Sequence, residues 1–181
     1  DDDAVGITVT PLAGLVTSEA GLTATFTIVL GSAPTADVVI PVSSSDPTEG
    51  TVSPASLTFT AANWNLPQTV TVTGVDDAID DGDVAYTLLT GAAVSADPSY
   101  NGQDAADVSA SNTDNDGAGI TVAPIAGLVT SESGATASFT VQLASQPTSD
   151  VIIPVTSDNT AEGAVSAASL TFTAANWNVA Q

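Results

Sequence analysis

Apolar and polar residues alternate along several short stretches of the chain. In TATFTIVL, from Thr23 to Leu30, the side chains of Ala24, Phe26, Ile28 and Leu30 fall on one face. Alternation with a period of two is typical of half-buried β-strands. Clusters of turn-forming residues, such as GSAPTAD and SSDPTEG, separate these stretches. No stretch of useful length has helical periodicity, so the pattern predicts an all-β protein.

The pattern predicts about seven strands in the first part of the chain. They cover residues 6–16, 22–30, 37–43, 56–60, 68–74, 84–90 and 105–112. Short strands at this spacing are typical of an immunoglobulin-like β-sandwich. Only 4% of the residues are aromatic, so we expect a core of aliphatic side chains supplemented by a few rings. Trp64 and its equivalent Trp177 are expected to close one end of the core rather than to bind a ligand.

The chain contains an internal repeat with an offset of 113 residues. Residues 1–68 align with residues 114–181 without a gap, and 45 of these 68 positions are identical. We therefore expect a tandem array. In it, 1–3 end a preceding repeat, 4–117 form a complete repeat, and 118–181 are a truncated second repeat with only the first four strands. The segment is expected to be an internal piece of a longer protein.

The charge of the chain is entirely negative. There are 21 acidic residues and no Lys, Arg or His, which gives a net charge of −21. Two carboxylates about 4 Å apart repel by roughly 4 kcal/mol at an effective dielectric constant near 20, so positive charge must come from solution. Nucleic acid and anionic membranes are excluded as partners because both require a basic surface. The hydrophobic content of 43% nevertheless predicts a folded core rather than disorder.

Other features of the composition concern the protein's location. No apolar run approaches the roughly 18 residues of a transmembrane helix, so no membrane insertion is expected. Cysteine is absent, which leaves metal ions as the obvious replacement for disulfides if the protein is exported.

Most acidic residues fall in alternate loops, which lie at the same end of an antiparallel sandwich. Between residues 4 and 116 there are fourteen acids, and only Asp37, Asp97, Asp104 and Asp107 lie outside these loops. The ten at the shared end are Glu19, Asp46, Glu49, Asp76, Asp77, Asp80, Asp81, Asp83, Asp114 and Asp116. A merely solvated acidic surface would scatter its carboxylates over both ends. Their concentration favours a cluster of calcium sites.

Oxygen ligands in irregular loops suit calcium, which takes six to eight of them. Zinc and copper sites are not expected because the chain has neither His nor Cys, whereas magnesium remains possible. The spacing does not match an EF-hand. Counted as a loop from Asp77, the twelfth position is Leu88, and the partial match at Asn112, Asp114 and Asp116 reaches Ala123 at that position. Any site must therefore be assembled from several loops.

A series of motifs resembles the Calx-beta domain, in the variety found in tandem arrays of large bacterial surface proteins. The motifs are SEAG, DVVIPV, LTFTAANW, PQTVTVTGVDDAIDDGD, Tyr86 and NTDND. The resemblance covers the whole first repeat and the truncated second one, and implies a calcium-binding immunoglobulin-like sandwich with more than one Ca²⁺ per complete repeat. The ligands it implies are Glu19, Asp46, Asp76, Asp77, the backbone carbonyl of Ile79, Asp81, Asp83, Asp114 and Asp116.

The sequence departs from the family pattern in places, which leaves the number and affinity of the ions open. Asn115 stands where the family often has a third acid, and Asp81 and Asp83 are shorter than the usual glutamates. Asp46 is offset by one position from Asp158 of the second repeat, so the acid that binds from this loop is not fixed. Asp80 and Glu49 could be ligands, or could only cap turns and add to the field.

An enzyme is not expected, because the chain lacks the His, Cys or Lys that nucleophilic catalysis requires. Paired carboxylates can hydrolyse glycosides, but no aromatic platform flanks these ones. We expect a calcium-rigidified extender module of a large extracellular or cell-surface protein, bacterial in origin, such as an adhesin or fibre. Its partners would be neighbouring repeats of the same chain, with self-association into a fibre. The alternatives are a calcium-responsive regulatory module and a carbohydrate-binding or other ligand-binding module.

Overall fold

The computed structural model describes residues 3–181, so Asp1 and Asp2 of the expected preceding repeat lie outside the described residues. The described residues form strands, turns and loops and contain no helix, as predicted. The chain divides into two compact units. Unit 1 extends to Asp77 and continues over Asp81–Asn115, while unit 2 comprises Ala78–Asp80 and Asp116–Gln181. The two units are described separately below.

Unit 1 contains ten strands, most of them short. They are β1 (Ile7–Thr10), β2 (Leu15–Ser18), β3 (Thr23–Leu30), β4 (Val38–Ser44), β5 (Gly50–Ser53), β6 (Ser56–Phe59), β7 (Gln68–Gly74), β8 (Val84–Thr90), β9 (Val94–Ser95) and β10 (Val108–Thr113).

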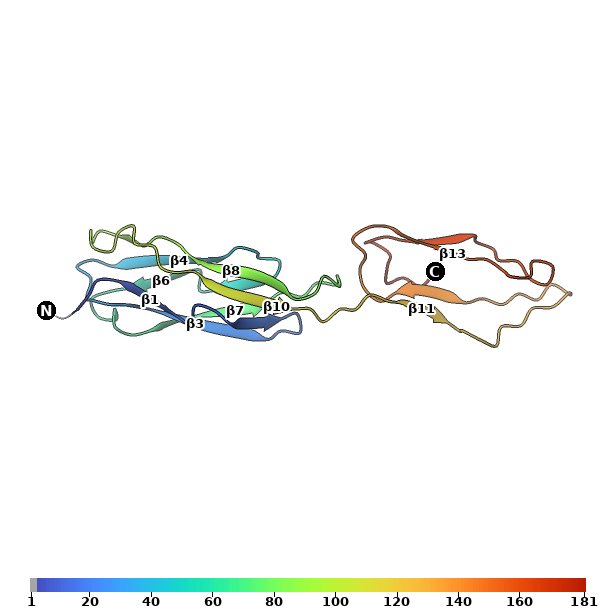
Figure 1. Ribbon diagram of the computed structural model, residues 1–181, viewed down its shortest axis with the longest axis horizontal. Helices are drawn as coiled ribbons and strands as arrows, with labels where there is room; N and C mark the ends of the chain where they lie inside the picture. The colour runs from blue at the N-terminus through green and yellow to red at the C-terminus, as the bar shows by residue number, and fades with distance from the viewer. Residues whose placement is uncertain (1–2) are drawn as a thin grey trace. The chain divides into compact units, whose positions relative to one another are not determined.

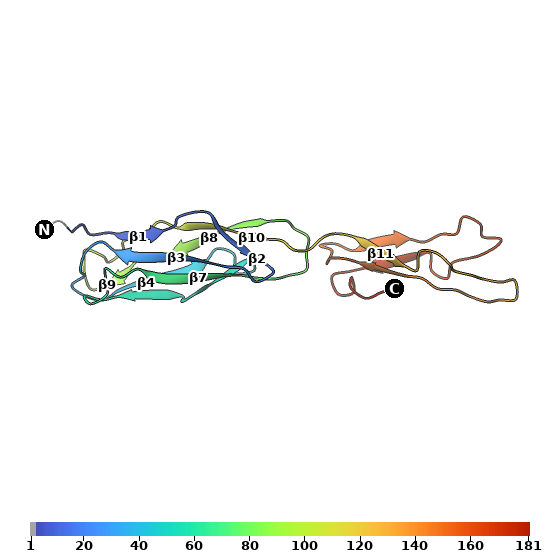
Figure 2. The same ribbon diagram turned by 90° about the horizontal axis from the view of Figure 1, so that it is seen from below.

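The strands of unit 1 form two sheets that face one another, with β3 and β7 in one layer and β4 and β8 in the other (Figure 1, Figure 2). One sheet has the order β1-β3-β7-β5, and the other has the order β2-β10-β8-β4-β6, with β9 paired to β4. Neighbouring strands are antiparallel except for β10 and β2, which are parallel. Unit 1 is therefore an immunoglobulin-like β-sandwich, and this part of the prediction is confirmed.

The predicted number of strands was too low because two segments cross from one sheet to the other. The single strand predicted at 6–16 is divided at Pro11 into β1 and β2, which pair with different sheets. Pro54 separates β5 from β6 in the same way, and β5 was not predicted at all. Proline has no N–H to donate, so a strand ladder tends to end where it occurs. The two-residue β9 is too short to show alternation.

The core of unit 1 lies between the sheets and consists of the inward-facing alternate positions. Phe26 and Ile28 of β3 and Val70 and Val72 of the neighbouring strand β7 are all fully buried, and Phe26 pairs directly with Val70. Trp64 packs against this cluster, as expected, and its carbonyl accepts the Leu30 N–H at 3.1 Å.

Unit 2 holds four short strands in two separate pairs. They are β11 (Ile120–Ala123), β12 (Thr140–Leu143), β13 (Val151–Pro154) and β14 (Ser169–Phe172). The strands pair β11 with β12 and β13 with β14. Only Val141, Leu143 and Phe172 are buried apolar residues, and Trp177 packs against them. Unit 2 therefore has a much smaller core than unit 1.

Candidate metal centre

Four acidic segments meet at one end of unit 1. They are the β2–β3 loop with Glu19, the β4–β5 loop with Glu49, the β7–β8 loop, and the residues that follow β10 (Figure 1). Backbone hydrogen bonds hold them together: Glu19 donates its N–H to the Thr113 carbonyl at 3.2 Å, and Val75 donates to the Glu49 carbonyl at 3.0 Å. The antiparallel order of the strands brings these loops to the same end, so residues far apart in the sequence become neighbours.

The first carboxylate group consists of Glu49, Asp77 and Asp81. One oxygen from each lies within 4.8 Å of the others. Asp77 and Asp81 are exposed, whereas Glu49 is only 8% exposed. Burial raises the pKa of the Glu49 carboxyl, and the charges of Asp81, Asp46 and Asp77 raise it further. A weak hydrogen bond from the Asn112 amide, at 3.5 Å, opposes this rise in pKa.

A network of buried polar side chains positions the Glu49 carboxylate. The Asn112 side chain, 2% exposed, donates to Glu49 and to the Val75 carbonyl, the latter at 2.9 Å. Thr17 donates to the Asn112 amide oxygen at 2.9 Å and lies 3.0 Å from the Tyr86 hydroxyl. Burial raises the pKa of Tyr86, and the charge of Glu49 adds to this rise while the Thr17 hydrogen bond opposes it. Side chains of three strands, β2, β8 and β10, therefore form the network that fixes this one carboxylate.

The second carboxylate group consists of Glu19, Asp114 and Asp116, again with one oxygen from each within 4.8 Å of the others. Glu19 is 8% exposed and accepts the Asn115 N–H at 3.0 Å. Asp114 accepts the Gly82 N–H at 2.7 Å, which ties the segment after β10 to the β7–β8 loop. Asp116 follows directly on the last residue of unit 1. This group therefore gathers residues separated by almost the whole repeat.

Asp76 and Asp83 contact the segment that follows β10, next to the second group. Asp83 accepts the Asp114 N–H at 3.2 Å, and Asp76 accepts the Asn115 side-chain amide at 3.3 Å. These two carboxylates orient the segment that follows β10, and neither is part of either carboxylate group.

Asp46 also lies outside both carboxylate groups. Its carboxylate accepts both the N–H, at 3.0 Å, and the hydroxyl of Thr48, which is the geometry of a side-chain-capped turn. These hydrogen bonds, that of the Thr48 hydroxyl first, lower the pKa of Asp46.

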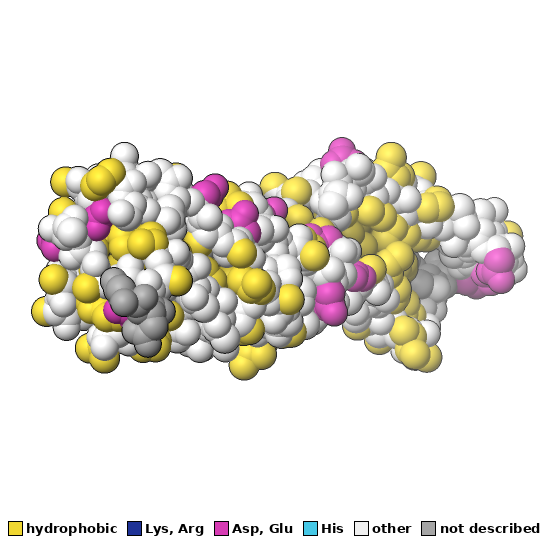
Figure 3. All heavy atoms as spheres, turned by 60° about the vertical axis from the view of Figure 1, so that its left-hand side comes forward, with side chains coloured by type: hydrophobic (Ala, Val, Ile, Leu, Met, Phe, Trp, Pro, Cys, Tyr) yellow, Lys and Arg dark blue, Asp and Glu magenta, His cyan; other side chains and the backbone are white. Residues whose placement is uncertain are grey.

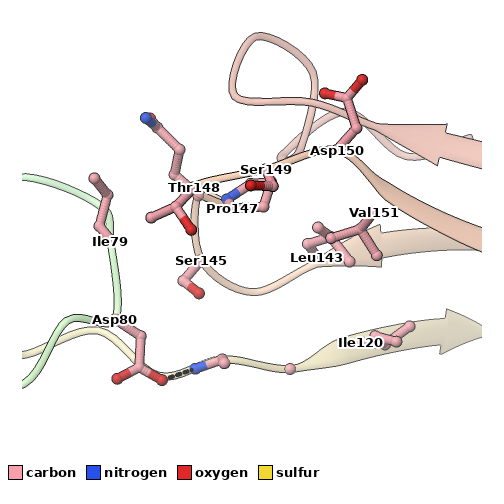
Figure 4. A pocket seen from close by; sticks show the side chains of 13 residues that line it. Ile79, Asp80, Ile120, Leu143, Ser145, Pro147, Thr148, Ser149, Asp150 and Val151 are labelled. Atoms are coloured by element: carbon pink, nitrogen blue, oxygen red, sulfur yellow. Dashed lines mark hydrogen bonds between the residues drawn. The ribbon is translucent and has the colours of Figure 1, made fainter.

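Ile79 and Asp80 belong to unit 2, where both line a shallow pocket (Figure 4). Asp80 accepts the Ala118 N–H at 2.6 Å, drawn as a dashed line in Figure 4. Asp80 therefore caps the backbone N–H of Ala118, which is one of the two roles that the sequence left open.

The sequence also left the role of Glu49 open, and the structure places it in a carboxylate group. The internal repeat contained a signal for it. Glu49 and Gly50 align with Glu162 and Gly163, whereas Asp46 aligns with Asn159. Gly50 begins β5 directly against the Tyr86 ring, where a Cβ atom would clash.

The donor set of both groups suits a hard cation. Every side-chain ligand in the two groups is a carboxylate, and calcium prefers oxygen ligands at about 2.4 Å, so two ligands of one ion lie at most about 4.8 Å apart. On the face shown in Figure 3, the acidic side chains lie among neutral and apolar ones, and no basic side chain is seen. The residues present therefore fit a calcium ion in each group.

Comparisons with known proteins give the fold only. No protein-family profile and no curated protein matches the chain. Among solved structures, the periplasmic chaperone SfaE is similar with a TM-score of 0.48 and 8% identity, over 61% of this chain and 58% of that one. SSP-19, an MSP-domain protein of Caenorhabditis elegans, matches with a TM-score of 0.44 and 20% identity, over 59% and 99% of the two chains. Domains 1–6 of the surface layer protein SbsC match with a TM-score of 0.37 and 16% identity, over 84% and 19%.

The chain thus spans somewhat over half the length of the SfaE chaperone. At these identities the similarity concerns only the β-sandwich. In the part of the chain that the structure describes, no helix is long and apolar enough to cross a membrane.

Proposed function

We propose that unit 1 is a calcium-binding structural module of a large protein exposed outside the cell, of the kind that the Calx-beta resemblance implies. The observation that carries the proposal is the pair of three-carboxylate groups at one end of the sandwich. The chain has no basic residue that could neutralise them. Extracellular calcium modules bind with dissociation constants of roughly 10⁻⁴–10⁻³ M, so they are filled only where calcium is abundant.

Each ion would join segments that are distant in the sequence. At the first group, Glu49 and the pair Asp77 and Asp81 would link the β4–β5 loop to the β7–β8 loop. At the second group, Glu19 and Asp114 would link the β2–β3 loop to the residues after β10. Calcium supplies only charge and coordination there. The chain's own residues fix the loops and exclude part of the water, because Glu19 and Glu49 are buried.

Binding would also order the connection to the next copy of the repeat pattern. The second group includes Asp114 and Asp116, and the repeat pattern starts again at Gly119. The intervening sequence DGAG contains two glycines and is conformationally permissive. Fixing Asp114 and Asp116 on an ion would restrict this connection, which is what an extender module requires.

The test is the thermal stability of the full chain in excess chelator and in millimolar calcium. Ligand that binds only the native state adds about 1.4 kcal/mol per site to the free energy of unfolding at 10 times its dissociation constant. We therefore expect a clearly higher melting temperature with calcium, and saturable heat in a calorimetric titration. An unchanged melting temperature would reject the proposal.

Single Asp→Asn variants, compared with a matched control, test which carboxylates bind the calcium ions. Asp77→Asn and Asp114→Asn should each weaken calcium binding, because each removes a charged ligand from one group. Asp104→Asn is the control, since Asp104 is an exposed carboxylate outside the four acidic segments. If Asp104→Asn weakened calcium binding as much as the other two, the binding would be a general effect of net charge.

A further inference from the structure

Asn112 of β10 is a buried amide whose hydrogen bonds reach three other segments of unit 1. Its nitrogen donates to the Glu49 carboxylate at 3.5 Å and to the Val75 carbonyl at 2.9 Å. Its oxygen accepts the Thr17 hydroxyl at 2.9 Å. The partial EF-hand match in the sequence would make Asn112 a calcium ligand at the first loop position. In the structure this side chain is instead turned into the protein, where it supports the candidate metal centre.

The Asn112 amide holds two parts of the first carboxylate group. One partner, Glu49, is itself a member of that group, and the other, Val75, comes two residues before Asp77. The Val75 N–H donates to the Glu49 carbonyl at 3.0 Å, so these three residues are joined in a ring of hydrogen bonds. Loss of the amide would therefore loosen both segments that supply the first group.

Asn112 and Thr17 also lead directly into the second carboxylate group. Thr17 comes two residues before Glu19, and Asn112 comes two residues before Asp114. The two side chains lie on opposite residues of the parallel pairing of β2 with β10, and this alignment continues to Thr113, whose carbonyl accepts the Glu19 N–H. The hydrogen bond between Thr17 and Asn112 therefore helps to fix how Glu19 and Asp114 approach each other.

The Asn112 amide is held in a single orientation. Gly74 lies so close that a Cβ atom at that position would be 2.5 Å from the amide oxygen. Turning the amide over would place its oxygen against the Val75 carbonyl and the Glu49 carboxylate, which are both acceptors. The donors and the acceptor of Asn112 are therefore already aimed at their partners before any ion binds.

We propose that Asn112 is a positioning residue shared by the two carboxylate groups, and that it sets the calcium affinity of both. This inference rests on the proposed function, because it concerns the same two groups. Replacing a residue that orients metal ligands without touching the ion changes metal affinity by about 10- to 100-fold. Asn112 contacts one ligand directly and orients the segments that carry the others.

Calorimetric titration of calcium into the full chain tests the proposal with the variant Asn112→Asp. An ionised aspartate has the same shape and keeps an acceptor for the Thr17 hydroxyl, but it donates to neither Glu49 nor Val75. If only charge mattered, the added carboxylate would tighten calcium binding. Loss of positioning should instead weaken it about tenfold or more.

Two backgrounds separate the groups. In Asp77→Asn only the second group keeps its three carboxylates, and in Asp114→Asn only the first group does. Adding Asn112→Asp to either background should weaken the remaining calcium binding about tenfold or more. Weakening in one background alone would confine Asn112 to that group and overturn the shared role.

Thr90→Val is the matched control. Thr90 is 2% exposed, as Asn112 is, and its hydroxyl donates to two backbone carbonyls at the opposite end of β8 from Val84, the residue that pairs with Asn112. This variant should lower stability and leave calcium affinity unchanged. An equal loss of affinity in Thr90→Val and Asn112→Asp would reduce the effect to general destabilisation and contradict the proposal.

Hydrogen exchange in excess chelator gives a readout without metal. The Glu19 and Val75 amides should exchange faster in Asn112→Asp than in the wild type, because their hydrogen bonds join segments that Asn112 holds together. Unchanged exchange at both amides would overturn the positioning role. If Asn112→Asp does not fold, Thr17→Val replaces it: valine has nearly the same shape, lacks the hydroxyl that Asn112 accepts, and should shift calcium affinity and Glu19 exchange in the same direction.

The outcomes for the wild type and the variant distinguish this inference from the proposed function. A wild-type chain that binds no calcium would reject the proposed function and this inference with it. Wild-type binding that Asn112→Asp leaves unchanged would reject only the role of Asn112.

Discussion

Glu49 combines burial, like charge and a weak hydrogen-bond donor in one side chain. The residue is 8% exposed, and its carboxylate lies in a group with Asp77 and Asp81 and accepts the 3.5 Å hydrogen bond from Asn112. The charged form is therefore disfavoured in the folded chain unless a cation is present. The repeat could indicate that this glutamate matters, but its burial depends on the packing of β5 against Tyr86, which no local pattern contains.

The first prediction concerns Glu49→Gln in excess chelator. A carboxyl whose pKa is raised on folding contributes stability below its unfolded pKa and loses that contribution as the pH rises through the folded value. The wild type should therefore lose stability relative to the variant as the pH rises above the unfolded pKa of 4.5 towards pH 7. Urea unfolding at several pH values measures this difference.

Calcium should reverse the order of stability of the wild type and Glu49→Gln, since the variant lacks a charged ligand. In millimolar calcium at pH 7, Glu49→Gln should be the less stable protein. The same order of stabilities with and without calcium would mean that Glu49 does not bind the ion.

Replacing Asp97 should change the pH dependence of stability in the opposite direction to replacing Glu49. Its two carboxylate oxygens accept the N–H groups of Thr35 and Ser99, each at 2.8 Å, and these bonds lower its pKa. Stability from this carboxylate is present above its unfolded pKa, near 3.8, and is lost as the pH falls through the lower folded value. Asp97→Asn has only one acceptor oxygen, so its melting temperature should be lower at pH 7.

The deficit of Asp97→Asn should shrink steadily below pH 3.8. Differential scanning calorimetry between pH 2 and pH 7 measures it. A deficit that stayed constant over this range would show that the two hydrogen bonds do not depend on the charge of the carboxylate.

At the level of strands, alternation of apolar residues predicted the central elements well. Segments such as Thr23–Leu30 and Gln68–Gly74 have neighbours on both sides, so they alternate over their full length. The prediction was wrong where one segment changes sheets, as at Pro11 and Pro54. Alternation shows which face of a strand is buried, but not which sheet the strand joins, because that is decided by partners far away in the sequence.

Gly74, the last residue of β7, provides the third prediction. A Cβ atom there would lie 2.5 Å from the Asn112 amide oxygen and 2.9 Å from the Ser18 carbonyl carbon. The backbone of β7 cannot shift to make room for this atom without moving away from Asn112 and Ser18. We expect Gly74→Ala to lower the free energy of unfolding by about 1–3 kcal/mol, as overpacked sites usually do. Gly6→Ala is the control, because a Cβ atom there meets nothing within 4 Å.

Chemical denaturation of both variants in excess chelator measures the difference without interference from metal. A loss in Gly74→Ala no larger than in Gly6→Ala would show that the contact between β7 and β2 relaxes easily.

For the whole chain, the repeat predicted one complete repeat and one truncated repeat of four strands. The structure has a large core in unit 1 and a small one in unit 2. What the sequence could not show is which pairings remain in unit 2. In unit 2, β11 pairs with β12 and β13 pairs with β14, as β1 pairs with β3 and β4 with β6 in unit 1.

The fourth prediction follows from this difference in core size. Local stability depends on buried contacts, so amides of β11 to β14 should exchange with solvent much faster than those of β3, β7 and β8. Hydrogen exchange of the full chain, followed by mass spectrometry, resolves the two units. Equal protection in both would mean that unit 2 is stabilised by something other than its own core.

The parallel pairing of β2 with β10 has a mechanical consequence. β2 belongs to the first segment of unit 1 and β10 is its last strand, and the two run in the same direction over Leu15–Ser18 and Ala110–Thr113. A pull on the two ends of the unit draws these strands past one another along their length. The load then falls on all of their hydrogen bonds at once rather than on one bond after another, so this short ladder acts as a shear clamp against stretching.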